Sequence, residues 1–264
     1  MAVSFARIDT KDLEVVRWSP SSEVHSDLTA VLLHEGLGCV AMWKDFGYYL
    51  AENLGIPVLA YSRAGYGRSG PIELPRPLTY MEQEADRNLP PFLNKLCPGR
   101  RLLLGHSDGA TIALAYAGTS HDPLLAGVIA IAPHVIVEEL TLESIRQAKR
   151  DFQEGVLAEK LSRYHGANLD TAFWGWNDAW LDPGFRSFSI LERLETITVP
   201  VLAIQGDLDP YGTTKQLELI ASRCERTSTA LIKNARHAPH LSHAQEVLTH
   251  VRRFVAMLNV QVHP

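Results

Sequence analysis

The chain has 264 residues, of which 46% are hydrophobic and 21% are charged, and its formal net charge is -5. These values are typical of a globular protein that is long enough to bury a core without disulfide or metal staples. Proteins that bind nucleic acids usually carry a basic excess. The acidic balance therefore excludes nucleic acid as an expected partner.

The cysteines and the first residues of the chain bear on its compartment. Cys39, Cys97 and Cys224 cannot all pair within one chain and match no zinc-site spacing, which favours free thiols in a reducing cytoplasm. The first ten residues lack the basic and apolar parts of a secretory signal. The longest apolar runs have roughly ten residues, whereas a membrane helix needs about twenty. We expect a cytoplasmic protein with no membrane partner.

Short apolar runs alternate with helical patterns along most of the chain. Nearly continuous apolar runs are typical of strands that are buried on both faces, as in a parallel sheet covered by helices. We expect strands at residues 5–8, 13–18, 28–33, 57–61, 102–104, 125–132, 199–204 and 230–232. We expect helices at residues 43–54, 80–89, 108–117, 211–222 and 242–258, with Pro90 and Pro91 breaking or kinking the chain after the second. The pattern predicts an α/β protein with a mainly parallel sheet of about eight strands.

Residues 134–196 interrupt this alternation, because they contain no good strand pattern. Helical patterns occur instead at residues 141–154, 156–164, 168–181 and 185–194. We interpret this segment as a helical cap, or lid, inserted into a core made of residues 1–133 and 197–264.

The strongest chemical signal is a G-x-S-x-G motif at residues 105–109, directly after a predicted strand and before a predicted helix. A nucleophile at such a sharp turn needs neighbours with almost no side chain two residues away, which Gly105 and Gly109 provide. The turn would expose the hydroxyl of Ser107 above the sheet. Ser107 is therefore the predicted nucleophile.

A serine nucleophile also requires two backbone N–H groups that bind the developing oxyanion. One is expected from Asp108, the residue after the nucleophile. The other is expected from the glycine-rich loop that follows residues 28–33, with Gly36 as the first choice and Leu37 as the second.

Carboxylate and imidazole groups follow the last two predicted strands. Asp207 and Asp209 could both orient a histidine, and we prefer Asp209 because Asp207 stands at the strand end and could simply cap the turn. His237 is the predicted general base, and His240 is expected to be structural. A metal site on His237, His240 and His243 is a minor alternative, since no carboxylate or cysteine completes it. We expect no metal and no cofactor.

The order Ser, Asp, His resembles that of the α/β-hydrolase superfamily, in its cap-bearing branch of serine hydrolases. Residues 63–69 are similar to the R-x-G-x-G-x-S loop of that family, and the family places a cap where residues 134–196 fall. Glu35 stands where the family often has glycine, and so does Arg236. The resemblance implies an α/β-hydrolase fold and catalysis through an acyl-enzyme formed on Ser107 by the triad with Asp209 and His237.

Trp174, Trp176 and Trp180 lie close together in the predicted cap. They could form a packed cap core or the wall of a pocket for an apolar acyl or aryl group. Trp176 and Trp180 are four residues apart and share a helix face. They could therefore serve one of these two roles while Trp174 serves the other.

The favoured function is a serine hydrolase that acts on a small-molecule substrate, namely a carboxylic ester, a thioester or a lactone. One alternative is a hydrolase that cleaves a carbon–carbon bond in a ring-fission diketone with the same triad. A second alternative is a ligand receptor on the same fold. The sequence leaves a homodimer open.

Overall fold

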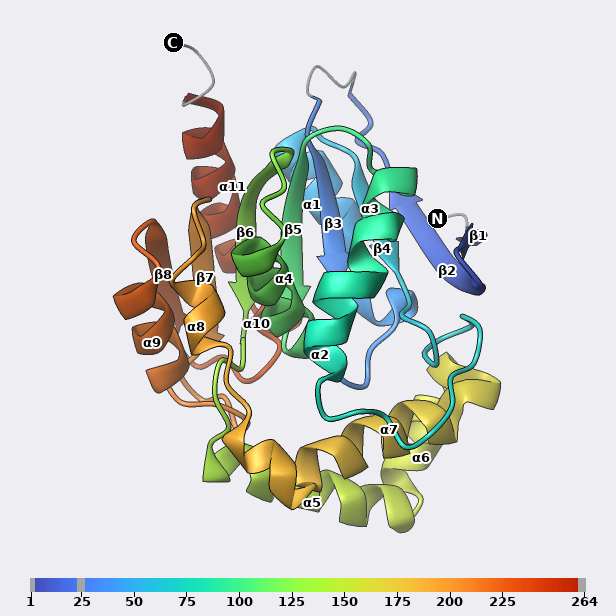
Figure 1. Cartoon of the computed structure of the whole chain (residues 1–264). Coiled ribbons are helices and arrows are strands. Elements are labelled where there is room, and N and C mark those ends of the chain that lie inside the picture. The colour runs from blue at the N-terminus through green and yellow to red at the C-terminus, as the bar shows by residue number, and fades with distance from the viewer. Residues whose placement is uncertain (1–2, 23–26, 261–264) are drawn as a thin grey trace.

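A single eight-stranded sheet forms the centre of the protein, which a computed structural model describes over residues 3–22 and 27–260 (Figure 1). The strand order is β1-β2-β4-β3-β5-β6-β7-β8. Strands β3 to β8 run parallel to one another, and the β1–β2 and β2–β4 pairs are antiparallel. This confirms the predicted α/β class and the mainly parallel sheet. The strand bounds are β1 Val3–Ile8, β2 Lys11–Trp18, β3 Thr29–Leu33, β4 Val58–Tyr61, β5 Arg101–His106, β6 Leu125–Ile131, β7 Val201–Gly206 and β8 Thr227–Ile232.

The parallel strands end at one edge of the sheet. Leu33 of β3 pairs with Gly105 of β5, and His106 pairs with Ile131 of β6. All residues of β4, β5 and β7 are buried, as expected for apolar strands that helices cover on both faces. The loops that leave these carboxyl ends therefore meet, and in open α/β sheets that edge is where ligands bind.

Helices cover both faces of the sheet (Figure 1). One apolar core lies under α1 (Phe46–Leu54) and α11 (Ala244–Val260). A second core lies on the other face, under five helices. These are α2 Tyr80–Gln83, α3 Leu89–Leu96, α4 Asp108–Thr119, α8 Leu191–Leu194 and α9 Lys215–Arg223.

Pro90 and Pro91 do not end the helical segment in which they lie, which corrects the expected break. The chain passes from α2 through a wide helical turn at Glu84–Asn88 into α3, which begins at Leu89. The two prolines thus occupy the first turn of α3. At those positions the missing backbone N–H would have had little role in the helix, so proline is tolerated.

Between β6 and β7 the chain is helical, as the sequence predicts, apart from an isolated bridge between Ile136 and Ser189. Helices α5 (Glu139–Gln153), α6 (Val156–His165) and α7 (Leu169–Leu181) lie together beyond the carboxyl ends of the strands, at the bottom of Figure 1. Phe152 of α5 stacks on Phe173 of α7, with ring centroids 3.6 Å apart. That this segment acts as a separate lid stays a prediction.

Across the described ranges, every helix is too short or too polar to cross a lipid bilayer.

Candidate active site

Ser107 stands at the turn between β5 and α4, and its backbone is left-handed with φ 54° and ψ -119°. A non-glycine residue in this region is strained, and such strain is stored where the surrounding structure enforces it. The Ser107 N–H donates to the carbonyl of Ile131 at 2.8 Å, which holds the turn against the end of β6. The side chain is thereby placed at the amino end of α4.

Gly105 and Gly109 allow this turn to form. A Cβ on Gly105 would overlap the carbonyl of Gly109, and a Cβ on Gly109 would overlap the carbonyl of Leu33. The turn therefore packs backbone against backbone at both sites, which explains in physical terms why the motif needs glycine there.

His237 meets Asp209 across loops that leave β8 and β7. Its Nδ1 lies 2.9 Å from each carboxylate oxygen, and the Asp209 side chain is 1% exposed. Burial would raise the pKa of this carboxyl, but the hydrogen bonds from His237 and the Tyr211 N–H hold the pKa below its ordinary value. Asp207, the other carboxylate considered, is exposed to solvent.

Ser107 and His237 line one cavity of about 100 Å³. Its walls come from the loop after β3, the start of α4, the segment after β6, helices α5 and α7, and the loops after β7 and β8. The lining residues are Glu35, Gly36, Leu37, Ser107, Asp108, His134, Thr141, Ile145, Trp176, Trp180, Tyr211 and His237. The predicted nucleophile, base and oxyanion donors therefore share one cavity.

The loop after β3 is fixed by Arg63. Its guanidinium donates to the carbonyls of His34 at 2.5 Å and Glu35 at 3.0 Å, and its backbone N–H donates to Nε2 of His34 at 3.0 Å. Burial, followed by the charge of Arg63, lowers the pKa of His34 well below its ordinary value, so this ring is neutral. With its carbonyls held by Arg63, the loop presents Gly36 and Leu37 to the cavity.

Asp108 is the first residue of α4, so its backbone N–H has no acceptor within the helix. Its side chain is buried and accepts a hydrogen bond from the hydroxyl of Tyr80. The Tyr80 oxygen in turn accepts from Nε1 of Trp180 at 3.0 Å. The N–H of Asp108 is thus free of a helical partner while its carboxyl lies in a buried network, and its role as an oxyanion donor stays a prediction.

The three tryptophans of α7 separate into two groups. Trp176 and Trp180 line the cavity, and Trp176 packs directly on Gly36, where a Cβ would overlap its indole. Trp174 packs instead against Phe152 and Phe173, with ring centroids 5.5 Å and 5.0 Å away. The structure places Trp174 in the packing of the helices rather than at the cavity wall, because it projects from a different face of α7 than the other two.

Sequence reasoning missed several residues that border the cavity. His134 follows β6, and its ring centroid lies 5.7 Å from that of His237. Burial, then the charge of His237, lowers the pKa of His134 to about 3. At neutral pH this ring is therefore an uncharged part of the cavity wall. Glu35 also lines the cavity, and His106, which is not part of the lining, contacts both Glu35 and the backbone of His237. The signals that could have identified them are their positions. Glu35 lies in the loop after β3, called here the oxyanion loop, and His106 lies within the G-x-S-x-G motif.

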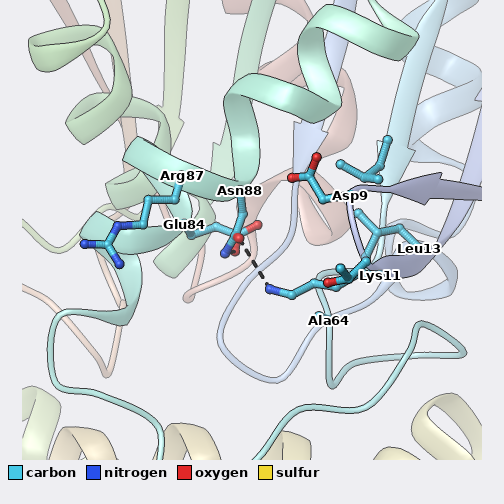
Figure 2. A pocket seen from close by; sticks show the side chains of 9 residues that line it. Asp9, Lys11, Leu13, Ala64, Glu84, Arg87 and Asn88 are labelled. Atoms are coloured by element: carbon cyan, nitrogen blue, oxygen red, sulfur yellow. Dashed lines mark hydrogen bonds between the residues drawn. The ribbon is translucent and has the colours of Figure 1, made fainter.

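A second cavity, of about 260 Å³, lies between the β1–β2 turn and the Glu84–Asn88 turn (Figure 2). Glu84 accepts hydrogen bonds from Tyr61 at 2.9 Å and Asn88 at 2.7 Å. Asn88 in turn accepts from Lys11 at 3.3 Å, the dashed line in Figure 2. These polar groups satisfy one another, which is consistent with a role in joining the hairpin to the helix.

Comparisons with known proteins agree with this architecture. Residues 30–250 match the alpha/beta hydrolase family. The chain is 26% identical, over 90% of its length and 95% of the relative, to a pimeloyl-[acyl-carrier protein] methyl ester esterase of Photorhabdus laumondii subsp. laumondii. Proline iminopeptidase of Mycobacterium smegmatis superposes with a TM-score of 0.76 at 17% identity, covering 99% of this chain and 100% of that one.

A thermophilic esterase from Thermogutta terrifontis superposes with a TM-score of 0.72 at 20% identity, covering 98% of this chain and 99% of that one. The two solved structures show that the fold is shared. The family match spans most of the chain, including the turn at Ser107 and the loops that carry Asp209 and His237. The chain therefore belongs to the alpha/beta hydrolase family and is a hydrolase.

Proposed function

We propose that this hydrolase cleaves small carboxylic esters, thioesters or lactones through an acyl-enzyme on Ser107. The observation that carries the proposal is the arrangement at the cavity. A strained serine and an imidazole held by a buried carboxylate line the same small space, together with N–H groups of the kind that bind an oxyanion. The similarity to a methyl ester esterase supports an ester as the substrate.

The geometry supports a serine mechanism in two steps. His237 takes the proton from the Ser107 hydroxyl as that oxygen attacks the carbonyl carbon. Asp209 holds Nδ1–H of His237, and its lowered pKa keeps it ionised, so that it stabilises the imidazolium. The N–H of Asp108 and that of Gly36 or Leu37 bind the oxyanion, and the imidazolium gives its proton to the leaving oxygen or sulfur as the ester or thioester bond breaks. His237, neutral again, then takes a proton from the water that attacks the acyl carbon, and the acid leaves as Ser107 regains its hydroxyl proton.

The cavity favours a short apolar acyl or aryl group. Sites for drug-sized ligands usually exceed about 300 Å³, whereas this cavity measures about 100 Å³. Leu37, Ile145, Trp176 and Trp180 give it apolar walls. We propose that acyl chains beyond a few carbons fit poorly unless α5 and α7 move.

Hydrolysis of p-nitrophenyl esters from acetate to laurate tests the proposal. We expect the wild type to turn over the short esters best. Ser107→Ala should lower kcat by at least about 10⁴-fold, because the nucleophile is removed. Ser222→Ala, an exposed serine at the end of α9, is the matched control and should keep full activity.

Covalent labelling separates the mechanism from simple binding. A fluorophosphonate should add its phosphonyl group, with loss of hydrogen fluoride, to the peptide that contains Ser107 and to no peptide of Ser107→Ala. If the wild type neither hydrolyses the ester series nor takes the label, serine ester hydrolysis is wrong. Turnover of a ring-fission diketone in that case would favour carbon–carbon hydrolysis.

A further inference from the structure

His106 contacts two of the loops that border the cavity and lies at the turn that carries Ser107. It is the last residue of β5 and precedes Ser107. Its Nδ1 lies 3.4 Å from the carboxylate of Glu35, which precedes Gly36, and its Nε2 lies 2.9 Å from the carbonyl oxygen of His237. Through this imidazole, the residue before the nucleophile contacts both the residue before Gly36 and the main chain of the base.

Both partners of the His106 ring are hydrogen-bond acceptors. A neutral imidazole carries one N–H and can satisfy only one of them, whereas an imidazolium carries two. The His106 side chain is 4% exposed and that of Glu35 is 21% exposed, so water offers His106 little replacement. The geometry thus fits an imidazolium paired with a carboxylate.

Two other buried histidines show the contrasting pattern. In His34, Nε2 accepts from the N–H of Arg63 and Nδ1 faces the carbonyl of Glu35 at 2.7 Å. In His165, Nδ1 accepts from the N–H of Gly67 and Nε2 faces the carbonyl of Leu37 at 3.0 Å. Each ring meets one donor and one acceptor, which a neutral tautomer satisfies. His106 differs from both.

The titratable groups around the His106 ring include Glu35, His240 and His134. Burial would raise the pKa of Glu35, but the hydrogen bond and charge of His106, followed by the charge of Arg63, hold it below its ordinary value. His240 packs against the His106 ring with centroids 4.5 Å apart. Burial, then the charges of His106 and His237, keeps the pKa of His240 well below its ordinary value. His134 is likewise neutral.

We propose that Glu35 and the buried His106 form an ion pair that positions His237 through its backbone carbonyl. Asp209 orients the ring of His237, and His106 holds its main chain, so that two anchors fix the base relative to Ser107. Because His106 directly precedes Ser107, its contact with the His237 carbonyl links the main chain of the base to the strand end that carries the nucleophile. Glu35 and His106 are positioning residues, and their role rests on the proposed function of His237.

Histidine-ring nitrogen NMR on the protein labelled with ¹⁵N-histidine reads the ion pair without any substrate. The His106 signal is assigned by its loss in His106→Gln. We expect both ring nitrogens of His106 to be protonated at pH 7, while His34 and His165 each show one protonated nitrogen. In Glu35→Gln, whose amide can donate to Nδ1, only Nε2 of His106 should stay protonated. A singly protonated His106 in the wild type overturns the ion pair.

Kinetics on a p-nitrophenyl ester tests the positioning role. Displacing a catalytic group by about 1 Å can cost on the order of a hundredfold. We expect Glu35→Ala to lower kcat by roughly tenfold to a hundredfold with KM changed less than about twofold. Glu35→Gln, which keeps the chain of hydrogen bonds, should recover most of that loss. Glu159→Gln, in an exposed ion pair with Arg163, is the matched control.

The outcomes separate the possible roles of Glu35, which also lines the cavity. A raised KM with unchanged kcat in both Glu35 variants would make Glu35 a substrate contact and overturn the positioning role. An unchanged kcat in folded Glu35→Ala, with folding checked by circular dichroism, would do the same. If the wild type cleaves no ester, the proposed function fails, while the NMR result still decides whether the ion pair exists.

Discussion

Two glycines, each with its own steric requirement, decide where Ser107 stands. Gly109 packs against the carbonyl of Leu33 and Gly105 against that of Gly109, with no room for a Cβ at either site. The left-handed backbone of Ser107 is therefore maintained by contacts to β3 and α4 and not by the preference of serine itself.

Gly109→Ala should lower the free energy of unfolding by about 3 kcal/mol, because the new methyl group must displace backbone and cannot move into free space. Urea unfolding followed by circular dichroism measures this. Gly70→Ala is the control, since a Cβ there would lie 3.5 Å from the carbonyl of Asp12, an ordinary contact. Equal stability of the two variants would contradict the steric explanation.

The buried carboxyl of Asp108 makes the free energy of unfolding depend on pH in a direction that can be derived. Burial raises the pKa of its carboxyl by more than Arg63 and Tyr80 lower it. Because the folded pKa lies above the unfolded value, ionising Asp108 costs stability, and this cost grows as pH rises from about 4 through the folded pKa. The stability contributed by the protonated group is present below the unfolded pKa and lost above the folded one.

Asp108→Asn removes this titration. The free energy of unfolding of the variant, minus that of the wild type, should therefore increase as pH rises from acid to neutral. Urea unfolding of both proteins at several pH values gives the difference. A difference that is flat or falls with pH would show that the buried carboxyl is not destabilised by ionisation.

At the scale of secondary-structure elements, helices α6 and α7 hold the oxyanion loop from outside the sheet. His165 of α6 contacts the carbonyl of Leu37 at 3.0 Å, and Trp176 of α7 packs on Gly36. The position of these helices is thus coupled to the loop that is proposed to bind the oxyanion. The four-residue spacing of Trp176 and Trp180 already puts them on one face of α7, and the packing of Trp174 against Phe152 of α5 shows which face turns away from the cavity.

Trp176→Ala should shift the preference of the enzyme toward longer acyl chains, because it removes a wall of the cavity. We expect the ratio of kcat/KM for octanoate to that for acetate to rise about tenfold. Trp174→Ala removes the same side chain from a place outside the cavity and should leave the ratio unchanged. The same shift in both variants would mean that loosened helices, and not the wall, set the preference.

At the scale of the whole molecule, the two ends of the parallel sheet differ. The cavity residues follow the carboxyl ends of the strands, and a buried ion pair lies at the opposite end. The carboxyl ends of β3, β5, β7 and β8 lead to the cavity residues. At the opposite end, Arg101 begins β5 and pairs with Asp122 at 2.9 Å, with side chains 3% and 7% exposed. Asp122 also accepts from the hydroxyl of Tyr116 at 2.7 Å. Removing Asp122 would leave a buried cation without its partner.

Asp122→Ala should lower the free energy of unfolding by about 3–5 kcal/mol, the usual result when one member of a buried ion pair is removed. Asp12→Ala breaks the exposed Arg7–Asp12 pair, whose side chains are both 58% exposed, and should cost less than about 1 kcal/mol. Thermal unfolding compares the two. Similar losses would show that burial of an ion pair does not determine its contribution to the free energy of unfolding.

The sequence by itself determined the α/β class, most of the strands and the turn at Ser107, because these follow from local patterns. Runs of apolar residues mark buried strands, and the spacing of Gly105, Ser107 and Gly109 is a steric requirement of one turn. The grouping of Ser107, Asp209 and His237 as a triad rests instead on the resemblance of their order to that of the family, and it stays a prediction.

Only the tertiary structure decided which side chains meet. It brought Asp209 and not Asp207 to His237, placed Trp176 and Trp180 but not Trp174 at the cavity, and set His106 between Glu35 and His237. The contacts of His237 and of His106 depend on the directions in which loops leave strands that are far apart in sequence, and the place of the tryptophans depends on how α7 packs. Periodicity describes one segment at a time, so it carries no information about those directions.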